Sequence, residues 1–437
     1  MDIKRAAFQA IFAGHKYQRS SGKKYYKIFI LAVSVFAGVS ASAGEKKITL
    51  YECLGRAMQT NAAINTAGQN LDEAYNSRLS AVGRVLPSVS ASAGYGYSGD
   101  ESYSYGLSAR QALFDGFSGI NGIRIENENI KKAKAEYDLV KAGVIYNVKS
   151  RYINLYKAQE SLELAESILK RREQQAEVVR ARYESGREHK GSYLTSKALA
   201  FEAETEIKSA ERNAELAGMS LSAVMGPGEP EVLSAVDFFK DVPSAGKEPV
   251  YAGIALNTPE FRKLDASGIA AGLRVETAKA SFYPSASLSG SYGKSGDVFL
   301  PKNESWRLGL NISFSVFSGF DNIVSVSSAK SQYAAAKINR EQGYTDKIIS
   351  LKEKWNAFKG AEEKLAVKKE HLAATEARAE IAQAKYSSGL LTYDNWIIIE
   401  NELISYKKAY LNALADLYLA EAAWEYEKGA CDYEKNK

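Results

Sequence analysis

The sequence predicts an α+β fold that is mainly α-helical and consists of two copies of one long structural unit. Two observations support this prediction. The peptide GRVLPSVSASAGYG at residues 83–96 returns as ASFYPSASLSGSYG at residues 280–293, and two stretches of nearly 70 residues, 119–186 and 322–388, contain no proline. A duplication of this length makes each copy repeat the same order of elements. We therefore expect a first repeat at residues 44–249 and a second at residues 250–437.

The offset between the two copies locates an insertion. It is 197 residues between Pro87 and Pro284, and it is 203 residues both between LFDGF at 113–117 and VFSGF at 316–320 and between RYESG at 182–186 and KYSSG at 385–389. The additional residues therefore lie in a loop near residues 297–304. Because residues 114–186 match 317–389 without a gap, we expect that stretch to be one rigid element.

Residues 1–43 have the features of a secretory signal peptide. Seven Lys and Arg residues precede an apolar run at residues 28–39, which ends in Ala41-Ser42-Ala43, a small-x-small cleavage pattern. The run is shorter than the roughly 20 residues of a transmembrane helix. Removal of this segment leaves 50 Lys and Arg against 51 Asp and Glu. The remaining chain is near neutral and has no basic stripe, so its charge does not support an assignment as a nucleic-acid-binding protein.

Each repeat is expected to begin with a helix, at residues 48–82 and 250–280, where apolar positions recur at helical spacing. The pattern then changes to strict alternation. From Pro87 onward the odd positions are apolar and the even positions are Ser or Gly, and the alternation resumes after a turn at residues 99–101. This period of two predicts a β-hairpin at about 87–114 and a second at about 284–317.

The apolar face of these hairpins is rich in aromatic residues, which suits contact with lipid. We expect five residues to face outward, namely Val89, Tyr95, Tyr105, Leu308 and Ile312. Strands with one apolar and one small, polar face are typical of transmembrane barrels, but a sheet packed on a soluble core alternates in the same way. Four strands do not close a barrel, and open edges are not tolerated in lipid. Either the sheet is soluble, or several chains contribute strands to one barrel.

The proline-free stretches predict two very long helices, at about 119–186 and 322–388. In the first, apolar residues recur every three or four positions from Ile130 to Leu169 between charged residues. This heptad-like stripe predicts a coiled coil about 100 Å long. Gly186 and Gly389 are expected to end these helices, and shorter helices at about 191–225 and 393–428 fold back along them. Gly and Pro residues between 226 and 249 predict a crossover between the repeats.

This duplicated order of alternating strands, LFDG, long helix, RYxxG and second helix resembles the TolC-like outer-membrane factors, the outer membrane efflux protein family. The resemblance covers essentially the whole chain after the signal peptide. It implies a homotrimer in which each chain gives four strands to a twelve-stranded transmembrane barrel, while the helices form an α-barrel in the periplasm. Three sets of four strands would leave no free edge.

The resemblance also implies a function: a passive exit duct in the outer membrane, with a long periplasmic extension. Such a duct joins an inner-membrane transporter through a periplasmic adaptor, or membrane fusion, protein in an efflux or type I secretion system. Nothing in the sequence identifies the cargo, and we place small-molecule efflux ahead of protein secretion. The alternative is a non-conducting periplasmic structural protein whose hairpins pack on its own coiled coils.

Candidate site residues follow from the same resemblance, which places the turns around Gly186 and Gly389 at the tip of the tunnel. Contact with the adaptor is expected at Tyr183, Gly186, Tyr386, Gly389 and Leu390. These residues are also what helix termination alone requires. Many family members carry an Asp six residues after each tip Gly, whereas this chain has Ser192 and Asn395 there. We expect a constriction formed by neutral side chains: Ser192, Leu391, Asn395 and Ile398.

The charged residues near the tip, Arg187, Glu188, His189, Lys190 and Asp394, are expected to form a solvated surface rather than a lock. No catalytic or metal-binding pattern is recognised, so we expect no enzyme activity and no cofactor. Cys53 and Cys431 could pair in an oxidising compartment. They could equally remain two free thiols, because separation in the sequence does not give their distance in space.

Overall fold

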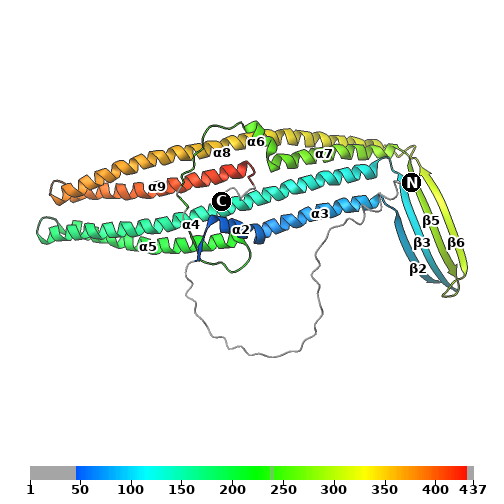
Figure 1. Ribbon diagram of the computed structural model, residues 1–437, viewed down its shortest axis with the longest axis horizontal. Helices are drawn as coiled ribbons and strands as arrows, with labels where there is room; N and C mark the ends of the chain where they lie inside the picture. The colour runs from blue at the N-terminus through cyan, green and yellow to red at the C-terminus, as the bar shows by residue number, and fades with distance from the viewer. Residues whose placement is uncertain (1–45, 237, 240, 431–437) are drawn as a thin grey trace, which may run out of the picture. The chain divides into compact units, whose positions relative to one another are not determined.

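The computed structural model describes residues 46–236, 238–239 and 241–430. The predicted signal peptide and Cys431 lie outside the described residues. Residues 44–437 form one compact unit. The unit is mainly α-helical with two β-hairpins, as predicted, and its long helices are joined to a sheet at one end (Figure 1).

The first repeat begins with the short strand β1 (Lys46–Ile48) and two helices, α2 (Leu50–Thr60) and α3 (Ala62–Arg84). Strands β2 (Ser88–Tyr97) and β3 (Glu101–Phe114) form its hairpin, followed by α4 (Ser118–Glu184) and α5 (Lys190–Met225). The second repeat follows strand β4 (Leu233–Ala235) and has helices α6 (Tyr251–Asn257) and α7 (Pro259–Lys279) and the short helix η1 (Ala280–Phe282). Strands β5 (Ser285–Gly296) and β6 (Asn303–Ser313) and helices α8 (Asp321–Ser387) and α9 (Tyr393–Glu427) complete it.

The two repeats agree closely in structure. Helices α4 and α8 both contain 67 residues, and their first residues, Ser118 and Asp321, differ by the offset of the sequence repeat. The pair Ser88 and Arg110 in the first hairpin corresponds to Ser285 and Ser313 in the second. The inserted residues therefore lie in the turn between β5 and β6 and do not change the register. The second hairpin's last strand ends at Ser313, before the expected limit of residue 317.

The helix expected before each hairpin is divided in two in the structure. Asn61 separates α2 from α3, and its Oδ1 accepts a hydrogen bond from the Ala63 N–H at 2.9 Å. Thr258 separates α6 from α7, where its Oγ1 accepts from the Phe261 N–H and Pro259 occupies the first position of the new helix. Both residues are strong N-caps, so each one begins a new helix and changes the direction of the chain.

The junction between each hairpin and its long helix has an unusual backbone. Gly116 and Phe117 have φ values of +66° and +69°, and Phe320 has +72°. A Cβ on Gly116 would lie 2.6 Å from the Ala280 carbonyl oxygen. Gly116 is therefore required both by its left-handed conformation and by this close approach of the second repeat. The F-x-G-F sequence landmark marks the point where sheet changes to helix.

Each long helix packs against two shorter ones along its length (Figure 1). Helix α4 contacts α3 on the side toward the sheet and α5 on the side toward the turn at Gly186, and α8 contacts α7 and α9 in the same way. Contacts of α4 with α7 and α9 join the two repeats. None of the described helices is both long enough and apolar enough to cross a membrane.

Three clusters of buried side chains hold the helices together. The first surrounds Tyr152, the second surrounds Leu417, and the third lies near the helix turns around Trp396. Strands β1 and β4 cover part of the first cluster as a two-stranded parallel sheet. This sheet was not predicted from the sequence, because three-residue strands are too short to produce a periodic pattern.

Candidate functional site

The two hairpins lie side by side in one four-stranded antiparallel sheet with the order β2-β3-β5-β6. Its register places apolar residues of all four strands on one face. One cross-strand row is Val89, Ala109, Gly290 and Leu308, and the next is Ala91, Leu107, Tyr292 and Trp306. Successive side chains of a strand point to opposite faces, so the intervening Ser and Gly residues form the other face. The alternation seen in each hairpin thus continues across the whole sheet.

The five residues expected to contact lipid lie on this apolar face. Val89, Tyr95, Leu308 and Ile312 are each more than 60% exposed. Tyr105 is half-buried, because its hydroxyl donates a hydrogen bond of 2.9 Å to the Phe299 carbonyl in the turn between β5 and β6. Contact with lipid itself stays a prediction. The exposure of so many large apolar side chains nevertheless requires a covering that the described residues do not supply.

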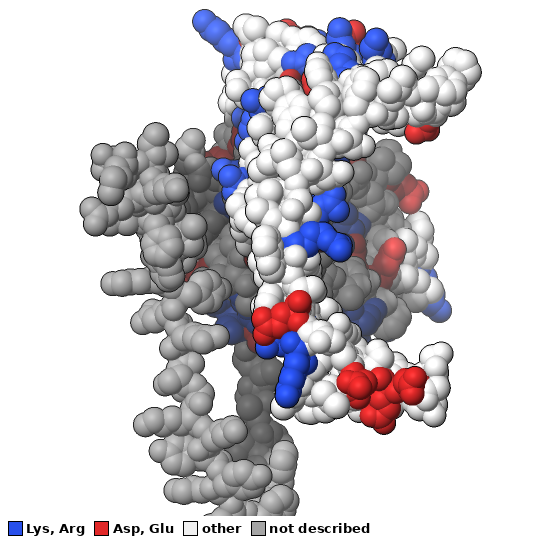
Figure 2. All heavy atoms as spheres, turned by 90° about the vertical axis from the view of Figure 1, so that its right-hand side faces the viewer, with Lys and Arg blue, Asp and Glu red and all other residues white. Residues whose placement is uncertain are grey.

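The sheet has two unpaired edges. Among the strands that the structure describes, β2 and β6 each pair on one side only, which leaves a row of free backbone N–H and C=O groups along both. Most of the visible surface of the sheet is uncharged (Figure 2). Acidic groups gather at the lower end in this view, which is the end away from the helices, where the hairpin turns lie. Unpaired edges of this length are sites for pairing with further strands, and β2 has no charged residue.

The opposite end of the unit carries two helix turns of identical construction. In the first, the Arg187 N–H donates to the Arg182 carbonyl at 2.8 Å and the Gly186 N–H donates to the Tyr183 carbonyl at 2.9 Å. Gly389 and Leu390 repeat both bonds in the second turn. This is the Schellman arrangement, which needs a left-handed residue after the helix. Gly186 and Gly389 provide it, with φ values of +71° and +81°.

The residues predicted to contact an adaptor differ in accessibility. Leu390 is highly exposed, and Tyr183 is partly exposed and stacks on Tyr193 with ring centroids 5.6 Å apart. Tyr386, in contrast, is buried against Trp396, 4.2 Å between centroids. An adaptor could therefore reach Leu390 and Tyr183 directly, whereas Tyr386 would act by holding the turn in place. Their role in binding an adaptor stays a prediction.

Tyr386 joins the two helical hairpins at the tip. Its hydroxyl donates a hydrogen bond of 3.0 Å to the Glu188 carboxylate, and its carbonyl accepts from Arg182 Nη1 at 2.7 Å. Burial, together with the bond to Glu188, raises the pKa of the Tyr386 hydroxyl. The expectation that Glu188 is a solvated surface residue is wrong. Only 11% of its side chain is exposed, because the second hairpin covers it.

The four residues expected to form a constriction do not share one environment. Asn395 and Ile398 are exposed on α9, and Leu391 is half-buried against the cluster around Trp396. Ser192 is buried inside the first hairpin, where its Oγ lies 3.1 Å from His189 Nε2. A buried side chain cannot line a passage within this arrangement, so the constriction proposal rests on Asn395 and Ile398, with Leu391 beside them.

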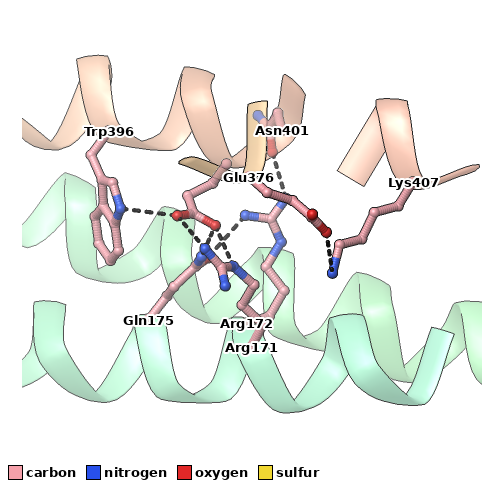
Figure 3. A network of polar contacts seen from close by, with 8 residues as sticks. Arg171, Arg172, Gln175, Glu376, Trp396, Asn401 and Lys407 are labelled. Carbon is pink, nitrogen blue, oxygen red and sulfur yellow. Dashed lines mark hydrogen bonds and ion pairs between the residues drawn. The ribbon is translucent and has the colours of Figure 1, made fainter. Parts of the chain in front are cut away.

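A polar network lies between α4 and α9, several turns from the tip (Figure 3). At its centre is the fully buried carboxylate of Glu400. Arg171 donates two hydrogen bonds to it, at 2.6 and 2.9 Å, Gln175 donates one at 2.6 Å, and the Trp396 indole donates one at 3.2 Å. Four donors thus compensate the loss of water around one buried charge.

Arg172 extends this network on the same side. Its guanidinium donates to Gln175 and to Asn401, and the side chain is buried. Burial is the main reason that the pKa of Arg172 is lowered from its ordinary value, which the nearby Glu400 charge partly opposes. Next to it, an ion pair of 3.8 Å joins Glu376 of α8 to Lys407 of α9 (Figure 3). The network therefore ties both helical hairpins together.

This network was not predicted from the sequence. Glu400 and Arg171 look like ordinary charged residues of a solvated helix, and they are 229 positions apart. One signal was present, because Arg172 and Gln175 interrupt the continuation of the apolar stripe of α4. Without knowledge of the neighbouring helix, these two polar residues indicate only that the apolar stripe ends there.

Cys53 is buried and His189 caps a helix. Cys53 is a buried thiol of α2 that is not disulfide-bonded among the described residues, and burial raises its pKa to about 12. Its predicted partner Cys431 is outside the described residues, so pairing stays a prediction. His189 caps α5, where its Nδ1 accepts from the Ser192 N–H at 3.2 Å. Within the described part of the chain, His, Cys, Asp and Glu form no group that could hold a metal ion.

Comparisons with known proteins agree with this architecture. The chain is 23% identical over 217 residues to nodulation protein T of Rhizobium leguminosarum bv. trifolii, a match that covers 46% of this chain and 44% of that protein. The chain thus matches less than half the length of this curated relative. A crystal structure of CusC matches with a TM-score of 0.80 at 18% identity, covering 87% of this chain and 91% of that one.

A third similarity is to the open state of the MtrE outer membrane channel of Neisseria gonorrhoeae, with a TM-score of 0.77, 20% identity and coverage of 87% and 88%. At these identities the solved structures establish the fold. The sequence model of the family described as "Outer membrane efflux protein" matches residues 53–227 and 251–424, one copy in each repeat. The chain therefore belongs to the outer membrane efflux protein family.

Proposed function

We propose that this protein is a passive exit duct of the outer membrane that works as a homotrimer. In the trimer, each chain contributes its four strands to a shared twelve-stranded barrel, and the helical hairpins form a tunnel in the periplasm. The observation that carries the proposal is the sheet itself, with two unlike faces and two unpaired edges. Pairing β6 of one chain with β2 of the next would remove every edge and give the apolar face to lipid.

The proposal extends to partners. The family description and the titles of the solved relatives refer to efflux and to outer membrane channels. We infer that the duct receives its cargo from an inner-membrane transporter through a periplasmic adaptor that binds the turns at Gly186 and Gly389. Small-molecule efflux is preferred to type I protein secretion. The two turns of the tip have the same pair of hydrogen bonds and are joined to each other through Tyr386.

Lipid quenching at neighbouring positions tests the barrel. A fluorophore is attached to Val89→Cys in one variant and to Ser90→Cys in another, both in a protein that also carries Cys431→Ser. The two positions lie on opposite faces of the same strand. Quenchers on the lipid chains should reduce fluorescence at position 89 and leave position 90 unchanged. Equal, weak quenching at both would support the alternative, a periplasmic structural protein without a channel.

The oligomeric state tests the shared barrel independently. The protein extracted from outer membranes in mild detergent should have the mass of three chains, with and without cross-linking, and should conduct ions in planar bilayers. A monomer recovered from the soluble periplasmic fraction would contradict the proposal, since four strands cannot close a barrel alone.

A further inference from the structure

The polar face of the sheet is almost free of charge. Its residues are Ser, Gly and Asn in nearly every row, for example Ser92, Gly106, Gly293 and Ser305. The acidic residues of the four strands, Glu101 and Glu304, fall on the apolar face instead, near the hairpin turns. In a barrel, the polar face is the lining of the passage.

Two residues are exceptions, and both are arginines. Arg110 on β3 pairs with Ser289, and Arg307 on β6 pairs with Ser291. Both side chains are exposed, and no ion pair joins either guanidinium to another residue of the described chain. Lys294, on the apolar face, is by contrast paired with Glu304 at 2.6 Å. The two uncompensated positive charges of the sheet thus lie together on its polar face.

The register puts these arginines close to one another. They occupy adjacent rows, because Ser289 and Ser291 are two residues apart on the intervening strand β5. Two residues along a strand span about 7 Å, and the two strand spacings from β3 to β6 span about 10 Å. Extended arginine side chains bridge much of this distance. In a trimer, six guanidinium groups would occupy one band of the lining, near the middle of strands β5 and β6.

The duplication indicates that these charges are not needed for folding. The position equivalent to Arg110 in the second hairpin is Ser313, and the position equivalent to Arg307 in the first hairpin is Ser104. Both hairpins have the same register, so serine fits the same strand positions. Each arginine thus adds a positive charge at a position where the other repeat has a neutral serine.

We propose that Arg110 and Arg307 form an anion-attracting band in the barrel, so that the duct favours anionic solutes, such as those bearing carboxylate or phosphate groups. This inference rests on the proposed function as a trimeric duct. Rings of Arg or Lys in a pore favour anions through their field. Guanidinium groups also bind carboxylates and phosphates through paired N–H donors, and they keep their charge at all physiological pH values.

Ion selectivity in planar bilayers tests the band. The ratio of chloride to potassium permeability is measured across a KCl gradient for the unaltered trimer and for the double variant Arg110→Ser, Arg307→Ser. We expect the double substitution to lower the ratio at least threefold at 0.1 M salt. The change should shrink at 1 M, where the screening length falls from about 10 Å to about 3 Å.

Two controls separate charge from other effects. The double variant Arg110→Lys, Arg307→Lys keeps both charges and should keep the ratio. Lys294→Ser removes a positive charge from the opposite face and should leave the ratio unchanged. A trimer that conducts normally but has the same ratio in the double serine variant would overturn the inference and leave the duct intact. An unaltered protein that forms no trimer and does not conduct would overturn the proposed function, and the inference with it.

Discussion

Glu400→Gln is predicted to loosen the contact between α9 and α4 strongly. The substitution keeps the size of the side chain but replaces one carboxylate oxygen with an amide NH2 group. The donors on Arg171 and Gln175 that now bond the same oxygen would then face another donor. Removing one partner of a buried ion pair costs about 3–5 kcal/mol. Arg171 is 30% exposed and can recover some hydration, which places the expected loss near the lower limit, about 3 kcal/mol.

Hydrogen exchange measured by mass spectrometry on the full-length protein reports this loss locally. A local opening that becomes about 3 kcal/mol easier speeds exchange by about a hundredfold, since every 1.4 kcal/mol is a factor of ten. The effect should be confined to α9 around residues 396–407 and the facing part of α4, because distant helices open independently. Helix α2 provides an internal reference.

Glu402→Gln is the matched control, since it makes the same chemical change two residues further along α9. Glu402 forms an ion pair with Arg378 at 2.7 Å, but 37% of its side chain is exposed. Exposed pairs contribute at most about 1 kcal/mol, so exchange should accelerate less than tenfold. Similar exchange rates in the Glu400 and Glu402 variants would show that burial does not make the Glu400 network strong.

Three further predictions concern other parts of the chain. Gly186→Ala should destabilise its turn by about 1–2 kcal/mol, because the residue has a left-handed backbone. Hydrogen exchange of the peptide that contains the turn should therefore accelerate. Gly360→Ala within α8 should instead stabilise the helix by up to about 1 kcal/mol. Burial alone would raise the pKa of Glu427, but hydrogen bonds from Lys347 and Ser350 outweigh it and lower that pKa. The stability from this carboxylate is therefore present above pH 4.5 and lost as the pH falls through the lowered value, so Glu427→Gln should reduce the melting temperature at pH 7 and have little effect in acid. Cys53 should react with maleimide only after unfolding, because the thiol is buried and its pKa is raised.

These predictions have specific controls. For the turn, destabilisation by Gly360→Ala as large as that by Gly186→Ala would show that backbone conformation is not the cause. For Glu427, the control is the more exposed Glu425, which pairs with Lys428 directly after the same helix. Its change to Gln should lower the melting temperature at pH 7 by a smaller amount. For Cys53, labelling is done with Cys431 replaced by Ser, and fast reaction of the folded protein would contradict its burial.

Membership in the outer membrane efflux protein family confirms two predictions made from the sequence: the chain is related to the TolC-like factors, and it is not an enzyme. The duplication also predicted the long helices well. Their sequences match without a gap, and any insertion within them would shift every contact with the helices alongside. Sequence periodicity predicted the two faces of each hairpin equally well, since the faces of a strand follow from its alternation alone.

Periodicity was less informative where a helix has several neighbours. The predicted stripe of α4 is buried at Val144, Val148 and Tyr152, but nearer the tip the buried positions are Ile168, Arg172 and others rather than Leu162 and Leu169. There α4 contacts both α5 and α9, so its buried surface is wider than one stripe. A single sequence does not reveal which side of a helix meets a second partner.

The sequence by itself determined the order and lengths of the main elements, the two faces of each hairpin and the glycine turns at Gly186 and Gly389. These properties are local, because they depend on residues within a few positions of one another. The tertiary structure alone decided that β3 pairs with β5, that Glu188 is covered by Tyr386, and that Glu400 meets Arg171. Those contacts join residues about 170 to 230 positions apart. Their energies come from burial and complementary charge, which only the packed chain creates.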